Sequence, residues 1–274
     1  MTTASRHWYP RANPATRPSH WWYWGRALYV SRRDYWRIFL RFAAVGLPLG
    51  AVGILLGVPL LVAAALALAG VGVVLLAYSI FGLYRMYGHP SMSYYRRLLL
   101  QGGVRDGMTV ADLHIGTYRT AFALADLLPA STIHSIDCWD LEGPPAEAAV
   151  SDVRELEPAP VGHRRIVPAR AAALALPLAD ASCDAVVLGF GTHEIPTGGP
   201  REKLLDEAVR VLRPGGRLLL FEHGTDIHNF VIFGPVIHHV TRRQEWLDAL
   251  RERFVDVTYM RSSAAVDLIT GRRV

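Results

Sequence analysis

The residues best suited to chemistry in this chain stand directly after short apolar runs. His193 and Glu194 follow one such run, and Glu222 and His223 follow another. A histidine has an ordinary pKa near 6.5, so it can act as a general base on a hydroxyl or phenol at neutral pH. A neighbouring carboxylate can orient its ring. We therefore take these four residues as the candidate catalytic group; the alternative is that they only shape a pocket through hydrogen bonds.

The same histidines and carboxylates raise the question of a metal ion. Side chains from several strand ends could bind a divalent cation. However, no two of them have the tight ligand spacing of a motif such as His-Glu-x-x-His, so we expect no metal site. His238 and His239 are either a solvated pair near the following helix or a lid over the site.

The elements that must position these residues alternate along the chain after residue 108. Apolar runs of strand type lie at 109–113, 132–136, 184–188 and 217–221, and helical stretches lie at 93–101, 118–128 and 201–212. This alternation predicts an α/β fold with a Rossmann-like, doubly wound and mostly parallel sheet. Ligands bind at the carboxyl ends of the strands in such sheets, so the polar residues there should meet along one edge.

The region from about residue 88 to 274 resembles the class I S-adenosylmethionine-dependent methyltransferases. The most specific piece is the run LLDEAVRVLRPGGRLLL at 204–220, where a helix ends in Leu-Arg-Pro-Gly-Gly before a strand. The stretch LPLADASCDAV at 176–186 matches the segment that leads into the fourth strand of that family. The resemblance implies methyl transfer with S-adenosylmethionine as the cofactor.

The cofactor loop is the part that departs from the family pattern. The run at 112–118 reads DLHIGTY, where the family usually has DLGCGTG. By resemblance the cofactor-binding residues are Asp112, His114, Gly116, Thr117, Asp137 and Cys138, with Asp137 accepting hydrogen bonds from ribose hydroxyls. His114 and Tyr118 replace glycines and add bulk near the methionine part of the cofactor. Ala172 stands where an acid often contacts adenine.

A long apolar segment precedes this region. No charged side chain occurs in the 43 residues from Phe42 to Tyr84. One membrane crossing needs about 20 residues, so the run predicts a transmembrane hairpin at 35–84. Its helices should cover about 35–56 and 60–84, with a turn at Gly57-Val58-Pro59. The glycines that would allow close helix contact are Gly46, Gly50, Gly53, Gly70 and Gly72. A hairpin buried in a soluble core is the alternative.

Charge is distributed unevenly around this hairpin. The 41 residues before it carry eight arginines and one acid, Asp34, so they hold +7 of a total of +5 and the remainder of the chain is at −2. A basic excess beside an apolar segment indicates a membrane surface rather than a nucleic acid. Arginines at both ends of the hairpin predict a cell-membrane protein with both ends, and the catalytic domain at 85–274, in the cytoplasm. Residues 1–34 are expected to form an arm and an interfacial aromatic segment, HWWYW at 20–24.

These observations lead to three hypotheses of function. The first is a membrane-anchored methyltransferase that acts on a lipophilic small molecule such as a phenol, quinone, lipid or terpenoid, with the lipid bilayer as its other partner. The second keeps the fold and performs acid–base chemistry without methyl transfer, such as a cyclisation or isomerisation of a hydrophobic substrate. The third is a membrane scaffold without catalysis.

Overall fold

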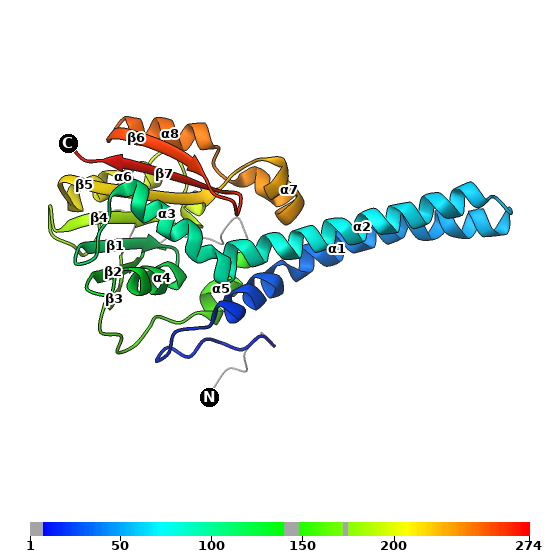
Figure 1. The fold of residues 1–274 in the computed structure, drawn as a ribbon, viewed down its shortest axis with the longest axis horizontal. Helices are drawn as coiled ribbons and strands as arrows, with labels where there is room; N and C mark the ends of the chain where they lie inside the picture. The colour runs from blue at the N-terminus through cyan, green and yellow to red at the C-terminus, as the bar shows by residue number, and fades with distance from the viewer. Residues whose placement is uncertain (1–7, 140–147, 172–174) are drawn as a thin grey trace.

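The computed structural model describes residues 8–139, 148–171 and 175–274 (Figure 1). Seven strands form one sheet in the order β3-β2-β1-β4-β5-β7-β6. The strands are β1 (Thr109–His114), β2 (Thr132–Asp137), β3 (Ile166–Arg170), β4 (Cys183–Leu188), β5 (Leu212–His223), β6 (Val255–Arg261) and β7 (Val266–Arg272). Neighbours among β1 to β5 pair in parallel, and β7 runs antiparallel to β5 and β6. The predicted Rossmann-like, mostly parallel sheet is confirmed.

Helices cover both faces of the sheet. They are α3 (Met92–Gly102), α4 (Arg119–Leu127), α5 (Ala148–Leu156), α6 (Pro200–Val211), α7 (Ile227–Phe233) and α8 (Arg243–Arg251). Strand side chains alternate between two buried clusters: Val110 packs on the side of α3 and α4, and the next residue, Ala111, packs on the side of α6 and α8. A strand buried on both faces must be apolar at successive positions, which explains the continuous apolar runs of the sequence.

Two long helices lead into this domain, α1 (His20–Leu55) and α2 (Pro59–Tyr87). The expectation that the first helix starts near residue 35 is wrong, because α1 begins at His20. Ser19 caps it, with its Oγ accepting a hydrogen bond from the Trp22 N–H at 3.1 Å. The aromatic residues at 20–24 therefore form the first turns of the same helix that continues into the hairpin.

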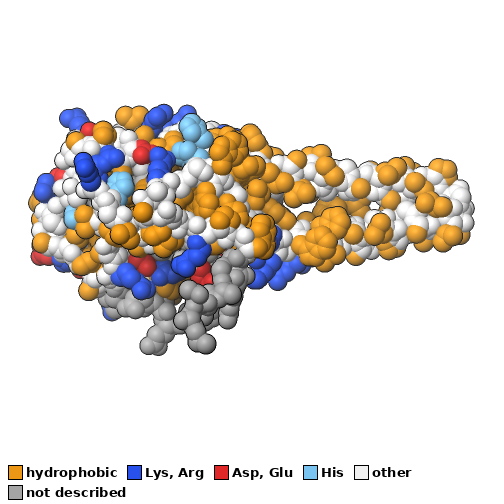
Figure 2. Space-filling view, turned by 90° about the horizontal axis from the view of Figure 1, so that it is seen from below, with side chains coloured by type: hydrophobic (Ala, Val, Ile, Leu, Met, Phe, Trp, Pro, Cys, Tyr) orange, Lys and Arg blue, Asp and Glu red, His pale blue; other side chains and the backbone are white. Residues whose placement is uncertain are grey.

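The outer halves of α1 and α2 project away from the domain as an antiparallel pair (Figure 1). They join at Gly57, whose φ of 63° allows the turn. Gly53 is required for their contact, since a Cβ there would lie 2.9 Å from the Leu61 Cβ, whereas Gly70 has no neighbour within 4 Å. Figure 2 shows hydrophobic side chains over the projecting pair. Both helices are long and apolar enough to cross a membrane, and almost none of the apolar stretch is buried.

The inner halves of the same helices pack on the catalytic domain. Tyr23 and Arg26 of α1 are buried, as are Leu83 and Met86 of α2. The Arg26 guanidinium forms an ion pair with Glu157, which follows α5. The described part of the N-terminal arm also contacts the domain, because the Ala12 N–H donates to the Leu156 carbonyl at 2.8 Å and the Val161 N–H donates to the Pro14 carbonyl at 2.7 Å. The hairpin helices thus begin and end as part of the catalytic domain.

Candidate functional site

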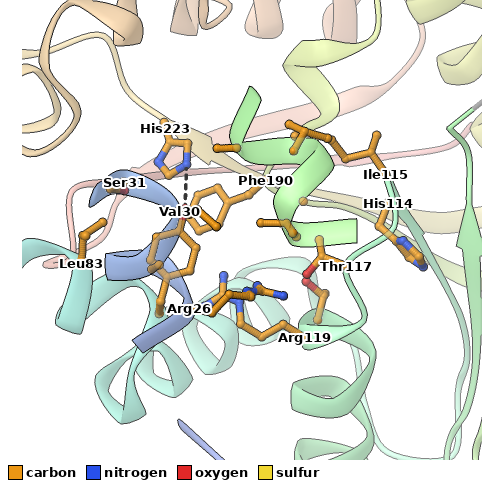
Figure 3. A pocket seen from close by; sticks show the side chains of 18 of the residues that line it. Arg26, Val30, Ser31, Leu83, His114, Ile115, Thr117, Arg119, Phe190 and His223 are labelled. Carbon is orange, nitrogen blue, oxygen red and sulfur yellow. Dashed lines mark hydrogen bonds between the residues drawn. The ribbon is translucent and has the colours of Figure 1, made fainter. Parts of the chain in front are cut away.

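A cavity lies between the carboxyl ends of β1, β4 and β5 and the inner halves of α1 and α2 (Figure 3). It encloses about 950 Å³ when its open mouth is included. The inner halves contribute Arg26, Ala27, Val30, Ser31, Leu83 and Tyr87. Below them, the loops after the strands contribute His114, Thr117, Phe190, His193 and His223, and α4 contributes Arg119. The predicted gathering of polar residues along one sheet edge therefore has a hollow above it.

The ten residues expected from the sequence divide between the lining of this cavity and the layer behind it. Those in the lining are His114, Thr117, His193 and His223. Those buried outside it are Asp112, Cys138, Glu194 and Glu222. Gly116 and Asp137 face each other across the side chain of Arg154. Ala172 lies outside the described residues.

The turn after β1 is closed by the ring that replaces a family glycine. His114 Nδ1 accepts a hydrogen bond from the Gly116 N–H at 2.9 Å, and Nε2 lies 2.9 Å from the Ser135 hydroxyl. Burial lowers the pKa of His114 to about 4, so the ring is neutral. The Tyr118 ring packs against it with centroids 4.6 Å apart. The two rings pack against each other and stabilise the turn. Gly116, at φ 95°, has no side chain, so its backbone forms a small patch that another side chain can cover.

Arg154 of α5 lies on that patch. Its Nη1 and Nη2 donate to the two carboxylate oxygens of Asp137 at 2.8 Å each, and Nη1 also contacts the Ile115 carbonyl. A Cβ at Gly116 would clash with the same guanidinium. The space between Gly116 and Asp137 is therefore a cradle for a flat polar group. The two hydrogen bonds that Asp137 accepts there are equivalent to those that two ribose hydroxyls would donate, so the residues fit the nucleoside of S-adenosylmethionine once Arg154 turns aside.

Two of the expected cofactor residues are inside the sheet instead. Asp112 is fully buried in β1, and its Oδ2 lies 3.3 Å from the Ser135 hydroxyl. Burial raises its pKa to about 8, so the carboxyl is protonated at neutral pH. The Cys138 thiol is buried, and burial raises its pKa as well. Neither side chain lines the cavity, so their assignment to cofactor binding stays a prediction.

Glu222 ties together the turns that follow β4 and β5. Its Oε1 accepts the His193 backbone N–H at 3.2 Å, and its Oε2 accepts the His223 N–H at 3.1 Å. The same Oε2 lies 2.9 Å from His193 Nδ1. A carboxylate that receives two backbone N–H donors is an acceptor, so Nδ1 of His193 carries the proton in this pair. Glu222 thereby sets the tautomer and the direction of the His193 ring.

His223 is held differently, by ring contacts. It stacks on Phe190 with centroids 4.0 Å apart and an interplanar angle of 2°, and its Nε2 lies 3.3 Å from the Tyr87 hydroxyl (Figure 3). Burial lowers the pKa of His223 well below its ordinary value, and the nearby His193 and Arg119 lower it further. Its buried Nδ1 has no hydrogen-bond partner in the described part of the chain. His223 is thus a neutral imidazole whose ring lines the cavity and whose Nδ1 is buried without a hydrogen-bond partner among the described residues.

Two cationic residues of the cavity were not found from the sequence. Arg119 is buried, donates to the Met86 carbonyl at 2.7 Å and the Tyr94 hydroxyl at 2.9 Å, and lies beneath Arg26 of α1 in Figure 3. A signal was present for each: Arg119 is the basic residue of the mainly apolar helix α4, and Arg26 closely follows the aromatic run at 20–24. Two buried guanidinium groups beside the cradle suit a ligand that carries a carboxylate.

The sheet order, the glycine turn after β1 and the acid at the end of β2 define a class of protein. Residues 112–220 match the family model described as a methyltransferase domain. The match shows a methyltransferase domain within residues 112–220, and S-adenosylmethionine is the cofactor that such a domain uses.

Relatives point to a narrower group. The chain is 33% identical over 127 residues to the ubiquinone/menaquinone biosynthesis C-methyltransferase UbiE of Syntrophotalea carbinolica. The aligned region covers 46% of this chain and 47% of the relative. It is 35% identical over 121 residues to the demethylmenaquinone methyltransferase of Thermus thermophilus, covering 41% and 46%. The chain thus spans about half the length of the curated relatives it matches. Among solved structures, the pyocyanin biosynthetic protein PhzM aligns with a TM-score of 0.51 at 16% identity, over 71% of this chain and 58% of that chain, which shows the fold.

Proposed function

We propose that this protein is a membrane-anchored methyltransferase that transfers a methyl group from S-adenosylmethionine to a lipophilic small molecule with a phenol- or quinone-type ring. One observation carries the proposal: the helices whose inner halves cover the catalytic cavity are the same helices whose outer halves project as an apolar pair. A membrane that held the outer halves would lie directly beside the mouth of the cavity.

The apolar part of the lining suits a substrate that arrives from lipid. Ala27, Val30, Leu83 and Phe233 all come from α1, α2 and the end of α7. A long-chain substrate that crossed water on its way would expose its chain at a cost of about 0.8 kcal/mol per CH₂. Entry along the hairpin avoids that cost. The names of the relatives, which mention ubiquinone, menaquinone and demethylmenaquinone, support an acceptor of the quinone type.

The charge at the base of the hairpin supports a cytoplasmic catalytic domain. Figure 2 shows basic side chains where the projecting pair meets the domain. Arg33, Arg37 and Arg41 are exposed on α1 there, and Arg85 stands near the end of α2. Arginines flank cytoplasmic ends of membrane helices and attract anionic lipid headgroups. We infer that both ends of the hairpin are on the cytoplasmic side of the cell membrane.

The residues of the site divide the work of methyl transfer. Bound S-adenosylmethionine supplies an electrophilic methyl group on a sulfonium. Gly116, Thr117 and Asp137 would hold its nucleoside end in the cradle, and Arg26 and Arg119 are the lining guanidinium groups that would attract its carboxylate. His223, neutral and at the cavity wall, takes the proton that the acceptor releases when it gains the methyl group. The Tyr87 hydroxyl orients His223.

A second candidate function is acid–base chemistry without methyl transfer. The observation in its favour is the Arg154–Asp137 pair, which occupies the cradle in this structure. If that pair persisted, the cavity and His223 would remain available for an isomerisation or cyclisation. A transfer assay with a labelled methyl group on the cofactor separates the two functions, because only methyl transfer moves the label from the cofactor to the product.

The test is a transfer assay with the full chain in lipid nanodiscs. The cofactor carries a labelled methyl group, and two acceptors share one naphthoquinol ring, one with a long polyprenyl chain and one without. We expect labelled product from both and a clearly lower KM for the long-chain acceptor. Asp137→Ala should abolish labelling, and its exposed neighbour Arg170→Ala serves as the control. A folded protein that labels neither acceptor would overturn methyl transfer; equal KM values would overturn the lipophilic substrate.

A further inference from the structure

Three side chains from two short helices converge behind the cavity wall. His193 and Glu194 belong to η2 (Thr192–Glu194), and His239 ends η3 (Gly234–His239). One ligand atom from each lies within 4.8 Å of the other two. Glu194 Oε1 is 3.1 Å from His239 Nε2 and 3.8 Å from His193 Nε2. The same carboxylate oxygen thus faces the Nε2 atoms of both histidines.

The opposite nitrogen of each histidine is already assigned. His193 Nδ1 donates to Glu222, which is an acceptor because it also receives two backbone N–H groups. His239 Nδ1 contacts the Val236 carbonyl, which can only accept. Each ring therefore keeps a proton on Nδ1 and turns its Nε2 toward Glu194, and the Nε2 of His239 is hydrogen-bonded to that carboxylate at 3.1 Å. A divalent ion bound between the three side chains would replace that hydrogen bond at Nε2 and leave the partners of both Nδ1 atoms in place.

We propose that His193, Glu194 and His239 bind one divalent transition-metal ion of the Zn²⁺ type. Two imidazole nitrogens and one carboxylate are a donor set that Zn²⁺ uses with a further position open. Donors around tetrahedral Zn²⁺ at about 2.0–2.2 Å are roughly 3.3–3.6 Å apart, and the two distances from Glu194 Oε1, 3.1 and 3.8 Å, bracket this separation.

The surroundings are those of a built metal site. Metal-binding histidines usually donate their other N–H to a carboxylate or a backbone carbonyl, and here Glu222 serves His193 while Val236 serves His239. The side chains of His193 and Glu194 are 4% and 0% exposed, and that of His239 is 25% exposed, so the ion has a path in from solvent. The bound ion would stand next to the cavity that His193 lines.

The position gives the ion a role that rests on the proposed function. Its open coordination position would be available to a hydroxyl oxygen of the acceptor, and a Lewis acid there would make the acceptor a better nucleophile. Metal binding itself does not depend on methyl transfer. A binding measurement can therefore fail while the transfer assay succeeds, or the reverse.

The experiment measures Zn²⁺ binding by the full chain in detergent. The protein is stripped with a chelator, exchanged into chelator-free buffer and titrated against a chromophoric competitor for Zn²⁺. We expect one ion per chain and a rise in Tm on addition of Zn²⁺. Glu194→Gln and His239→Ala should each weaken binding more than about 100-fold. Glu222→Gln, which changes only the outer partner, should weaken it about 10- to 100-fold.

The adjacent residue supplies the matched control. His238 is exposed, lies in the same short helix and is not part of the cluster, so His238→Ala should bind Zn²⁺ like the unaltered protein. Circular dichroism and Tm without metal confirm that each variant is folded. The proposal is wrong if the unaltered protein binds no stoichiometric Zn²⁺, which would leave a protonated His239–Glu194 ion pair. It is equally wrong if folded Glu194→Gln and His239→Ala keep full affinity.

Discussion

The inner and outer halves of α1 and α2 belong to the same helices but have opposite surroundings: the inner halves are packed on the domain, and the outer halves expose apolar side chains. The inner half of α1 is buried at Tyr23, Arg26 and Tyr29, whereas only Gly53 is buried in its outer half. The inner halves combine buried charge, hydrogen bonds and aromatic contacts with the domain. The outer halves combine exposed apolar side chains with contacts to each other. One pair of helices therefore covers the cavity with its inner halves and, under the proposed function, anchors the protein with its outer halves.

The ends of a helix therefore need not mark the ends of a functional part of the chain, since α1 contains both the packed half and the projecting half. Because α1 is continuous from His20 to Leu55, no linker separates its projecting half from the half that lines the cavity. A substitution of Arg26 should weaken the attachment of α1 to the domain, because Arg26 forms a buried ion pair with Glu157 of the domain.

The largest effect is expected at Arg26. Arg26→Ala leaves Glu157 buried with only the hydroxyls of Tyr23 and Thr117 as donors. Removing one partner of a buried ion pair typically costs about 3–5 kcal/mol, so unfolding in detergent should show a loss of that order. Arg33→Ala, on the exposed face of the same helix, should change the free energy of unfolding by less than about 0.5 kcal/mol. Equal small losses in both would show that the inner half is not coupled to the domain.

The next effect tests the outer half. Leu66 is 69% exposed near the middle of the projecting pair. Leu66→Arg should cost about 2.5–3.5 kcal/mol of membrane insertion and release the protein from membranes in a flotation assay. Turnover of the short-chain acceptor should persist, because the cavity is untouched. Leu66→Ala controls for the loss of the side chain. Unchanged flotation of the arginine variant would contradict a membrane role for the hairpin.

The response to pH should come from the domain, because the charge-free stretch from Phe42 to Tyr84 contains no carboxylate or histidine. Asp112 has its pKa raised from 3.8 to about 8. Between these values the folded protein keeps a proton that the unfolded chain has released, so stability falls as pH rises from about 4 to about 8. Asp112→Asn should remove that slope and stabilise the protein at pH 8 relative to the unaltered protein. Parallel pH profiles of Tm for the variant and the unaltered protein would refute the assignment.

The strands show which parts of the fold can be predicted from the sequence. The central strands β1, β2, β4 and β5 were predicted because strands buried on both faces need continuous apolar runs. The edge strands β3 and β6 escaped. β3 is short, largely exposed and contains Pro168, and polar residues alternate with apolar ones in β6. β7 was also missed, although it is buried, because Asp267 and Gly271 interrupt its apolar pattern.

The site residues divide in a similar way, into those that follow predicted strands and those that reach the site only through tertiary packing. His114, Thr117, His193 and His223 stand after predicted strands, so their place at the cavity followed from the sheet alone. Arg154 and His239 could not be found that way. Each reaches the site through tertiary packing of an element, α5 or η3, that no periodicity marked. Spacing in the sequence likewise gave no metal signal, because His193 and His239 are far apart along the chain.

The smallest expected effect concerns Arg154, which lies beneath the inner half of α1. Arg154→Ala removes the group that competes with the cofactor for Asp137, so S-adenosylmethionine should bind about 10-fold more tightly, a change of about 1.4 kcal/mol. The variant should be less stable alone, because Asp137 loses its bidentate partner, and should gain more in Tm from the cofactor. Arg170→Ala is the control, since Arg170 is exposed and its Nε lies 3.6 Å from the same carboxylate. Weaker cofactor binding by Arg154→Ala in calorimetry would show that Arg154 is instead part of the cofactor site.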